Sequence, residues 1–214
     1  MPRSPSATRA APPARRRTQE ERRAETRGRL LQAAIQSLIE VGYAGTTTRR
    51  VTELAGVSQG AQTHHFPRRV DLVTSAFEHL AAERLERFRE HAAKLPRARE
   101  ARVRGLLDLL WEDFSSPLFM VAVKLWVAAA EDEELRERLV PAERRIHEDM
   151  RAVAREAAGT LGEEPGFDRI LAVAMNTAAG LALTRAFDPS GRARRGDPWP
   201  YHRAALERML PARD

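Results

Sequence analysis

The residues best suited to bind a partner gather in one short stretch, residues 47–66. Within it, two helix-length segments are joined by Ala55-Gly56-Val57-Ser58. A glycine in this link can adopt a left-handed conformation, and the serine can cap the following helix, as a helix-turn-helix requires. We therefore predict this motif, whose second helix enters the major groove of DNA.

Small or hydrogen-bonding side chains on the second segment suit a surface that must fit the major groove. They are Gln59, Gly60, Thr63 and His64. Caps at the helix starts turn hydroxyl and backbone N–H groups toward solvent, where phosphates can accept hydrogen bonds. These caps are Thr47, Thr48 and Ser58. Arg68 and Arg69 follow the second segment and are placed to bind the next phosphate.

Positive charge is concentrated in the first third of the chain. Residues 1–29 carry a net charge of +6 and residues 30–70 a net +2, whereas the remaining 144 residues carry a net −2. This distribution is expected of a polyanion-binding head attached to a nearly neutral body.

Several classes of function are excluded by what the sequence lacks. Without cysteine, the chain cannot form a disulfide framework, a thiolate zinc site or a cysteine nucleophile. It contains no zinc-protease, phosphate-loop or Ser-His-Asp pattern, so we expect neither an enzyme nor a cofactor. Adjacent His64 and His65 point about 100° apart on a helix, which argues against a shared metal ion. The longest apolar run, residues 118–130, is interrupted by Lys124 and is shorter than the ~20 residues of a membrane span.

The spacing of apolar residues predicts an all-α fold, in which Leu54 packs inward. A capping box at Thr18 and Glu21 starts an amphipathic helix that ends at Gly42. No segment alternates with a period of two, so no strand is expected. The later segments 133–139 and 142–161 could be one helix kinked at Pro141. The other expected helices are 49–54, 59–63, 67–94, 98–114, 118–130, 167–187 and 199–210.

Three successive motifs resemble the TetR family of bacterial repressors. They read Gly42-Tyr43-Ala44-Gly45-Thr46-Thr47-Thr48, then Ala55-Gly56-Val57-Ser58-Gln59-Gly60, then His65-Phe66-Pro67-Arg68-Arg69. The resemblance covers residues 25–84 and implies an all-helical homodimer. In it, a three-helix head is linked by a long helix to a ligand-binding and dimerisation bundle. The resemblance also implies that the residues at the matching positions contact DNA: Thr48, Ser58, Gln59, Gly60, Thr63, His64, His65 and Arg69. We add Thr47 to these candidates because it caps a helix start.

The chain departs from the family pattern at three positions. Gln62 and Thr63 stand where the family usually has Leu-Tyr, and Thr52 replaces a small alanine. Loss of the tyrosine removes a common DNA contact, and the polar Gln62 occupies a position that usually packs the recognition helix. We interpret these changes as an altered sequence preference, because the caps, the turn and the basic flanks remain.

These considerations divide the chain into three predicted parts. Residues 1–20 form a disordered basic arm, residues 21–84 the DNA-binding domain and residues 85–214 the ligand-binding and dimerisation domain. The arm is either a solvated tail or a segment that follows the adjacent minor groove.

Aromatic and methionine side chains on the central helices could form an adaptable apolar ligand pocket, or could simply fill the core. The candidate lining is Leu110, Trp111, Phe114, Phe119, Met120, Val123 and Trp126. Small residues in segment 167–187 permit close approach of a second subunit. With segment 199–210 from each subunit, they could form a four-helix bundle.

The predicted function is sequence-specific transcriptional regulation in the cytoplasm, at the nucleoid. The partners expected are double-stranded DNA with a palindromic operator, a second copy of the chain and an unknown small-molecule effector, with no membrane. We expect a repressor that a small apolar or amphipathic ligand releases from DNA. The alternative is a ligand-independent DNA-binding or architectural protein.

Overall fold

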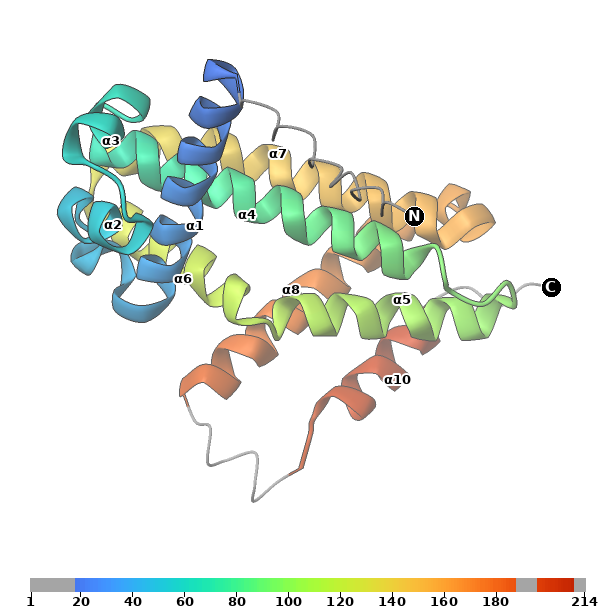
Figure 1. The fold of residues 1–214 in the computed structure, drawn as a ribbon. Helices are drawn as coiled ribbons and strands as arrows, with labels where there is room; N and C mark the ends of the chain where they lie inside the picture. Colours follow the sequence, from blue (N-terminus) through green and yellow to red (C-terminus); the bar gives the residue numbers. More distant parts are fainter. Residues whose placement is uncertain (1–17, 188–195, 210–214) are drawn as a thin grey trace, which may run out of the picture.

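The computed structural model describes residues 18–187 and 196–209, and within these ranges it is built from helices without strands (Figure 1). This confirms the predicted all-α class. Residues 1–17 of the predicted arm lie outside the described residues, whereas residues 18–20 belong to the start of α1. The elements are α1 Gln19–Gly45, α2 Thr48–Ala55, α3 Gln59–His65, α4 Arg69–Ala92, α5 Arg99–Phe114, α6 Pro117–Glu131, α7 Glu133–Ala158, the 3₁₀ helix η1 Gly159–Glu163, α8 Phe167–Phe187 and α10 Trp199–Met209.

Helix α1 begins where the capping box predicts. The Thr18 hydroxyl accepts from the Glu21 backbone N–H at 3.1 Å, and the Glu21 carboxylate accepts from the Thr18 N–H at 2.8 Å. Gly42 breaks the helix with φ +67°, after which one further turn reaches Gly45. Gly42, the predicted end of this helix, is therefore a kink within α1, and the helix ends at Gly45.

The helix-turn-helix is formed by α2 and α3. Gly56 ends α2 in the left-handed conformation with φ +61°, and Arg29 donates from α1 to the Gly56 carbonyl at 3.0 Å. Ser58 caps α3 by accepting from the Ala61 N–H at 3.2 Å. The expectation that Leu54 packs inward is wrong: its side chain is 40% exposed, because Ala55 takes the inward position one turn after Val51.

Two hydrophobic clusters form the core. The first joins α1, α2 and α4, with Phe66 at the end of α3, to α6 and the first half of α7, and includes Leu38, Val73, Leu125 and Leu139. The second joins the end of α4, α5 and Phe119 of α6 to the rest of α7, η1, α8 and α10. The three-helix head therefore does not close its own core, because α6 and α7 complete it.

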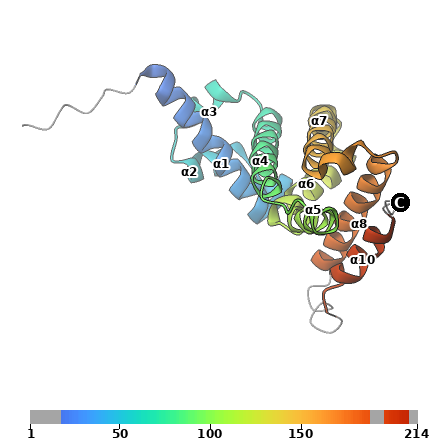
Figure 2. The ribbon, with the colours of Figure 1, turned by 90° about the vertical axis from the view of Figure 1, so that its right-hand side faces the viewer.

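Helix α7 runs without interruption through Pro141, so the two segments considered around this proline form one helix. It lies beside α4, and together these two long helices connect the head to the layer that contains α8 and α10 (Figures 1 and 2). Pro141 is exposed, at the outer side of the helix.

Helix α8 is the single described helix whose length and apolar composition would allow it to cross a membrane, a criterion that core helices of globular proteins also meet. A search for an uninterrupted apolar run misses it, because Asn176 and Thr177 divide its apolar residues into two shorter runs. Only 28% of its most apolar stretch is buried, so much of that surface is left uncovered by the described part of the chain.

The turn makes a testable prediction. Gly56→Ala should lower the free energy of unfolding by about 1–2 kcal/mol, because a Cβ is strained in the left-handed region. Gly60→Ala is the matched control: it lies within α3, where a Cβ meets only the Ser58 hydroxyl at 4.0 Å. It should raise the unfolding free energy by up to about 1 kcal/mol. Urea unfolding followed by circular dichroism measures both, and equal effects would contradict the assigned turn.

Candidate nucleic-acid interface and ligand cavity

The outer surface of α3 is made of small and polar groups. Gln59, Gly60, Thr63 and His64 are exposed, as is the cap Ser58, while His65 is half-buried. The sequence-predicted residues of this helix thus share one accessible surface. Small side chains allow a backbone to approach base edges closely, and hydrogen-bonding groups can read them.

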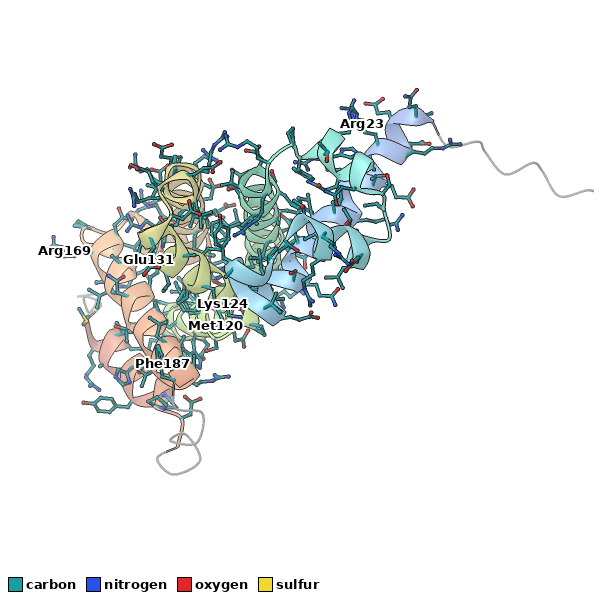
Figure 3. The ribbon with its side chains drawn as sticks, turned by 90° about the vertical axis from the view of Figure 1, so that its left-hand side faces the viewer. Arg23, Met120, Lys124, Glu131, Arg169 and Phe187 are labelled. Atoms are coloured by element: carbon teal, nitrogen blue, oxygen red, sulfur yellow. The ribbon has the colours of Figure 1, made fainter. Side chains whose placement is uncertain are left out.

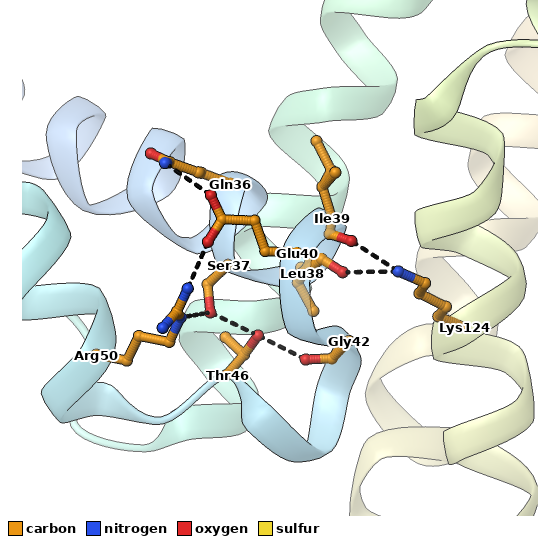
Figure 4. A network of polar contacts seen from close by, with 9 residues as sticks. All are labelled: Gln36, Ser37, Leu38, Ile39, Glu40, Gly42, Thr46, Arg50 and Lys124. Atoms are coloured by element: carbon orange, nitrogen blue, oxygen red, sulfur yellow. Dashed lines mark hydrogen bonds and ion pairs between the residues drawn. The ribbon is translucent and has the colours of Figure 1, made fainter.

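The three consecutive threonines have different surroundings. Thr46 is fully buried, donates to the Gly42 carbonyl at 2.7 Å and bonds to the Ser37 hydroxyl at 3.0 Å (Figure 4). Thr47 is exposed and caps α2 by accepting from the Arg50 N–H at 3.2 Å. Thr48 is half-buried. Since Thr46 is held in the interior, only the last two can present hydroxyl groups to a phosphate.

Gln62 replaces apolar packing by hydrogen bonding. It is 1% exposed, donates from its amide to the Phe66 carbonyl at 2.6 Å and accepts from the Gln59 amide at 2.7 Å. The departure from the family pattern is therefore satisfied inside the fold. The hydrogen bond between Gln59 and Gln62 uses one N–H of the Gln59 side-chain amide. The side-chain oxygen Oε1 of Gln59 stays available as an acceptor for an external donor.

Thr52, the other substituted position, is satisfied in the same way. It is buried, and its hydroxyl donates to the Arg49 carbonyl within α2 at 2.7 Å. Since its polar group has a partner, the substitution does not leave an unpaired donor in the head.

Arg68 and Arg69 have partners within the chain. The Arg69 guanidinium lies 3.9 Å from the centroid of the Tyr43 ring and donates to the Tyr43 carbonyl at 3.1 Å. Arg68 forms an ion pair with Glu134 of α7. Arg69 thus links the start of α4 to α1, and Arg68 links it to α7.

Tyr43 and Lys124 extend this joint between head and body. Burial raises the pKa of Tyr43, whose hydroxyl donates to Asp132 at 3.0 Å. Lys124 of α6 donates to the Ile39 carbonyl at 2.7 Å and lies 3.5 Å from the Leu38 carbonyl, next to the break in α1 (Figure 4). The end of α1 is therefore held by polar contacts from α6 and from the start of α7.

A cavity of about 390 Å³ lies among α4, α6 and α7. Of the predicted lining, Phe114, Phe119 and Trp126 do border it. Its other apolar walls come from residues of α4, α6, α7 and α8 that sequence reasoning missed: Phe77, Ala81, Ala82, Leu85, Ala122, Ala142, Ile146, Met150 and Met175. The heptad-like apolar spacing of α4 and α7 is the signal that could have indicated two inward faces, but not which of them meets a cavity.

The other four predicted pocket residues do not border this cavity. Trp111 stacks on Trp199 of α10, with ring centroids 5.2 Å apart. Leu110 is 1% exposed and belongs to the second core cluster, against which Met120 and Val123 also pack. These residues fill the second cluster rather than the space between α4 and α7.

The cavity contains groups that could orient a ligand. The Trp126 indole N–H is buried and has no hydrogen-bond partner among the described residues. Arg84 and Asp113, each with a side chain 11% exposed, form an ion pair at the wall. His147 and Glu143 lie opposite on α7, with Nδ1 and Oε1 2.6 Å apart. The cavity therefore combines apolar walls with charged side chains, among them Arg84, Asp113 and Glu143.

Comparison with known proteins agrees with this geometry. Residues 30–76 match the family model described as bacterial regulatory proteins, tetR family. The chain is 38% identical over 172 residues to the HTH-type transcriptional regulator CymR of Pseudomonas putida, covering 79% of this chain and 83% of that one. It is 36% identical over 177 residues to an uncharacterised HTH-type transcriptional regulator of Mycobacterium bovis, covering 81% and 89% respectively.

Solved structures share the fold. A transcriptional regulator from Streptomyces coelicolor superposes with a TM-score of 0.66 at 22% identity, covering 88% of this chain and 99% of that one. The multidrug binding protein EbrR, complexed with imidazole, superposes with a TM-score of 0.59 at 26% identity, covering 88% and 96%.

The fold and the matches define a helix-turn-helix transcriptional regulator, a DNA-binding protein and not an enzyme. More particularly, the chain belongs to the TetR family.

The hydrogen bonds of Gln62 lead to a stability prediction. Gln62→Ala should lower the free energy of unfolding by roughly 2–4 kcal/mol, because it leaves the Phe66 carbonyl unpaired and opens a cavity. Gln62→Leu should cost less, since it fills the space. The control is Gln36→Ala, an exposed amide that donates to Glu40, with an expected change within about 0.5 kcal/mol. Urea unfolding decides, and a Gln62→Ala effect no larger than the control would refute the buried role.

Proposed function

We propose that this regulator binds an inverted-repeat operator as a homodimer and represses transcription until a small apolar or amphipathic ligand releases it. The observation that carries the proposal is the accessible α3 surface, held by the capped turn against α1 and α2. In the proposed complex α3 lies in the major groove and the N-terminal caps of α2 and α3 bind phosphates. The protein acts in the cytoplasm, at the nucleoid.

Each predicted contact residue has a role in this proposal. Gln59 and His64 read base edges, Gly60 and Thr63 allow close approach, and His65 supports the end of α3. Thr47, Thr48 and Ser58 bind phosphate through hydroxyl or backbone N–H groups. Arg69 is proposed to act indirectly, because its guanidinium is held by Tyr43.

Dimerisation is assigned to α8 and α10. One face of α8 is exposed along its length at spacings of three and four residues, and consists of Val173, Asn176, Gly180, Thr184 and Phe187. On α10, Tyr201 is 74% and Met209 50% exposed. Apolar surface left open on two neighbouring helices supports a four-helix bundle with the partner subunit. A two-fold axis through that bundle pairs the two α3 helices with an inverted repeat.

The effector site is assigned to the cavity, because its walls come from both core clusters. Phe77 and Ala122 belong to the first cluster, whereas Phe114, Phe119 and Met150 belong to the second. A ligand there can change how the two clusters pack. The mixture of apolar walls and charged side chains around the cavity, with Arg84 and Asp113 among the latter, favours an amphipathic ligand. The EbrR complexes with imidazole and with ethidium support small-molecule binding within this fold.

Release is proposed to pass through α6. Ala122 and Trp126 face the cavity, while Lys124 on the same helix holds the carbonyls of α1. A shift of α6 on ligand binding moves α1, and with it the head. To empty a mostly occupied operator, the ligand must favour the released state by several kcal/mol, about 5.5 kcal/mol for a complete reversal.

Selection of bound duplexes from random DNA tests the proposal. The expected product is an inverted repeat whose half-sites lie about one helical turn apart. Recovery of no preferred sequence would contradict it.

A small-molecule panel added to the complex tests the effector site. Release of the DNA by at least one compound supports that site, and release by none supports the ligand-independent alternative.

The base-reading role predicts a specific loss of affinity. Gln59→Ala and His64→Ala should each weaken binding to the selected operator by about 1–3 kcal/mol, with a much smaller effect on random DNA. Gln32→Ala serves as the control, because Gln32 is exposed on α1 and donates to Glu83 of α4. Fluorescence anisotropy with both duplexes measures this, and an equal loss on random DNA would exclude base reading.

The dimer interface predicts an oligomeric change. Val173→Glu combined with Phe187→Glu, at positions 38% and 88% exposed, should convert the dimer to a monomer, because burying unpaired carboxylates is costly. Val127→Glu is the control: Val127 is 68% exposed but lies on α6. Sedimentation velocity distinguishes the variants. A persistent dimer in the double variant would place the interface elsewhere.

A further inference from the structure

We propose that the first turns of α1 form a second DNA-binding surface, which binds backbone phosphates flanking the bases read by α3. The inference rests on the proposed function and adds a contact outside the helix-turn-helix. Its residues are Arg23 and Arg27 of α1 with His64 and His65 of α3, named here the α1–α3 cationic strip.

The start of α1 projects beyond the head. Its residues before Leu30 make up three helical turns in which no residue is fully buried. Figure 2 shows this end of α1 extending past α2 and α3, and Figure 3 shows Arg23 on it, at the far end of the molecule from Phe187 of α8. The projecting turns therefore lie on the head, away from the proposed dimer interface.

Arg23 and Arg27 lie four residues apart and share a helix face. That face adjoins the end of α3, because the Arg27 guanidinium lies 5.3 Å from the centroid of the Phe66 ring. The ring centroid of Phe66 is 6.4 Å from that of His65, which in turn is 5.6 Å from that of His64. The four cationic or protonatable groups of the α1–α3 cationic strip thus run continuously from α1 to the exposed surface of α3.

The arginines of the α1–α3 cationic strip are exposed. None of the ion pairs in the described ranges involves Arg23 or Arg27. The Glu21 carboxylate is directed to the Thr18 N–H by the capping box. The pKa of the His65 imidazole is lowered by burial and by the positive charges of His64, Arg23 and Arg27. The exposed guanidinium groups of Arg23 and Arg27 attract an anion of repeating negative charge, and the imidazoles of His64 and His65 can add hydrogen bonds to it.

A phosphate backbone fits this requirement best. A helix in the major groove, which is about 12 Å wide, is bordered by a phosphate strand on either side. A row of cations that starts at the end of α3 and continues along α1 follows one of those strands outward from the reading helix. Arg22, in the same turns of α1, lies about 100° around the helix from Arg23 and is outside the α1–α3 cationic strip.

The test measures the salt dependence of operator binding by the full-length protein. Arg23→Gln and Arg27→Gln should each reduce the slope of log K against log salt concentration by about 0.9 for every phosphate that the variant no longer neutralises. The matched control is Arg22→Gln, which removes the same charge from a different face and should leave the slope unchanged. Arg27→Gln removes the cation that lies over the Phe66 ring and could lower stability for that reason. If thermal denaturation shows that it does, the result for Arg23→Gln decides the test.

Ethylation interference locates the phosphates that are bound. Phosphates outside each half-site should interfere with wild-type binding and cease to do so in the Arg23→Gln variant. Unchanged slopes in Arg23→Gln and Arg27→Gln, or an equal reduction in Arg22→Gln, would overturn the inference while operator recognition by the wild type stays intact. Failure of the wild type to prefer any sequence would instead overturn the proposed function.

Discussion

The structure depends on one apolar seam, where α1 packs between the rest of the head and α6. Leu38 and Leu125 are fully buried in the cluster that joins them, and the cluster continues into α7 at Leu135 and Leu139. Burial of apolar surface is the main favourable term in folding, so a head that shares its core with the body is stabilised by that body. The direction in which α3 faces is consequently fixed by α6 and α7 as well as by the turn that begins at Gly56.

Polar contacts across the apolar seam fix the position of α1 relative to α6 and α7. Lys124 holds the carbonyls beside the break in α1, Tyr43 donates to Asp132, and Arg68 pairs with Glu134. Hydrogen bonds of this kind contribute only modestly to stability, but they favour one register of two packed helices over its neighbours. The cavity lies where the first cluster meets the second, so its contents and the position of α1 depend on the same helix, α6. This arrangement gives the proposed effector a short physical route to the head.

Local features of this fold could be predicted from the sequence, whereas contacts between distant segments could not. The capping box at Thr18, the left-handed Gly56 and the cap at Ser58 are determined by neighbouring residues, and the structure confirms each. By contrast, the contact of Arg69 with Tyr43 and the cavity lining from α4, α7 and α8 could not be predicted. Both depend on how helices that are far apart in the sequence pack together.

Two aromatic side chains show the difference. Phe77 faces the same space as Met150 only because α4 and α7 lie side by side, which no local pattern reveals. The side-chain type of Trp111 favours a pocket residue, yet its stacking on Trp199 gives it a different role.

Native-state hydrogen exchange tests the shared core most directly. If head and body form one cooperative unit, the slowest amides of α1, around Leu31 and Ile35, should open with the same free energy as those of α6 around Leu125. Both groups should also respond equally to a destabilising change such as Leu125→Ala. Exchange of the α1 amides at a much lower free energy, with α6 still protected, would show a head that unfolds alone and would contradict the account.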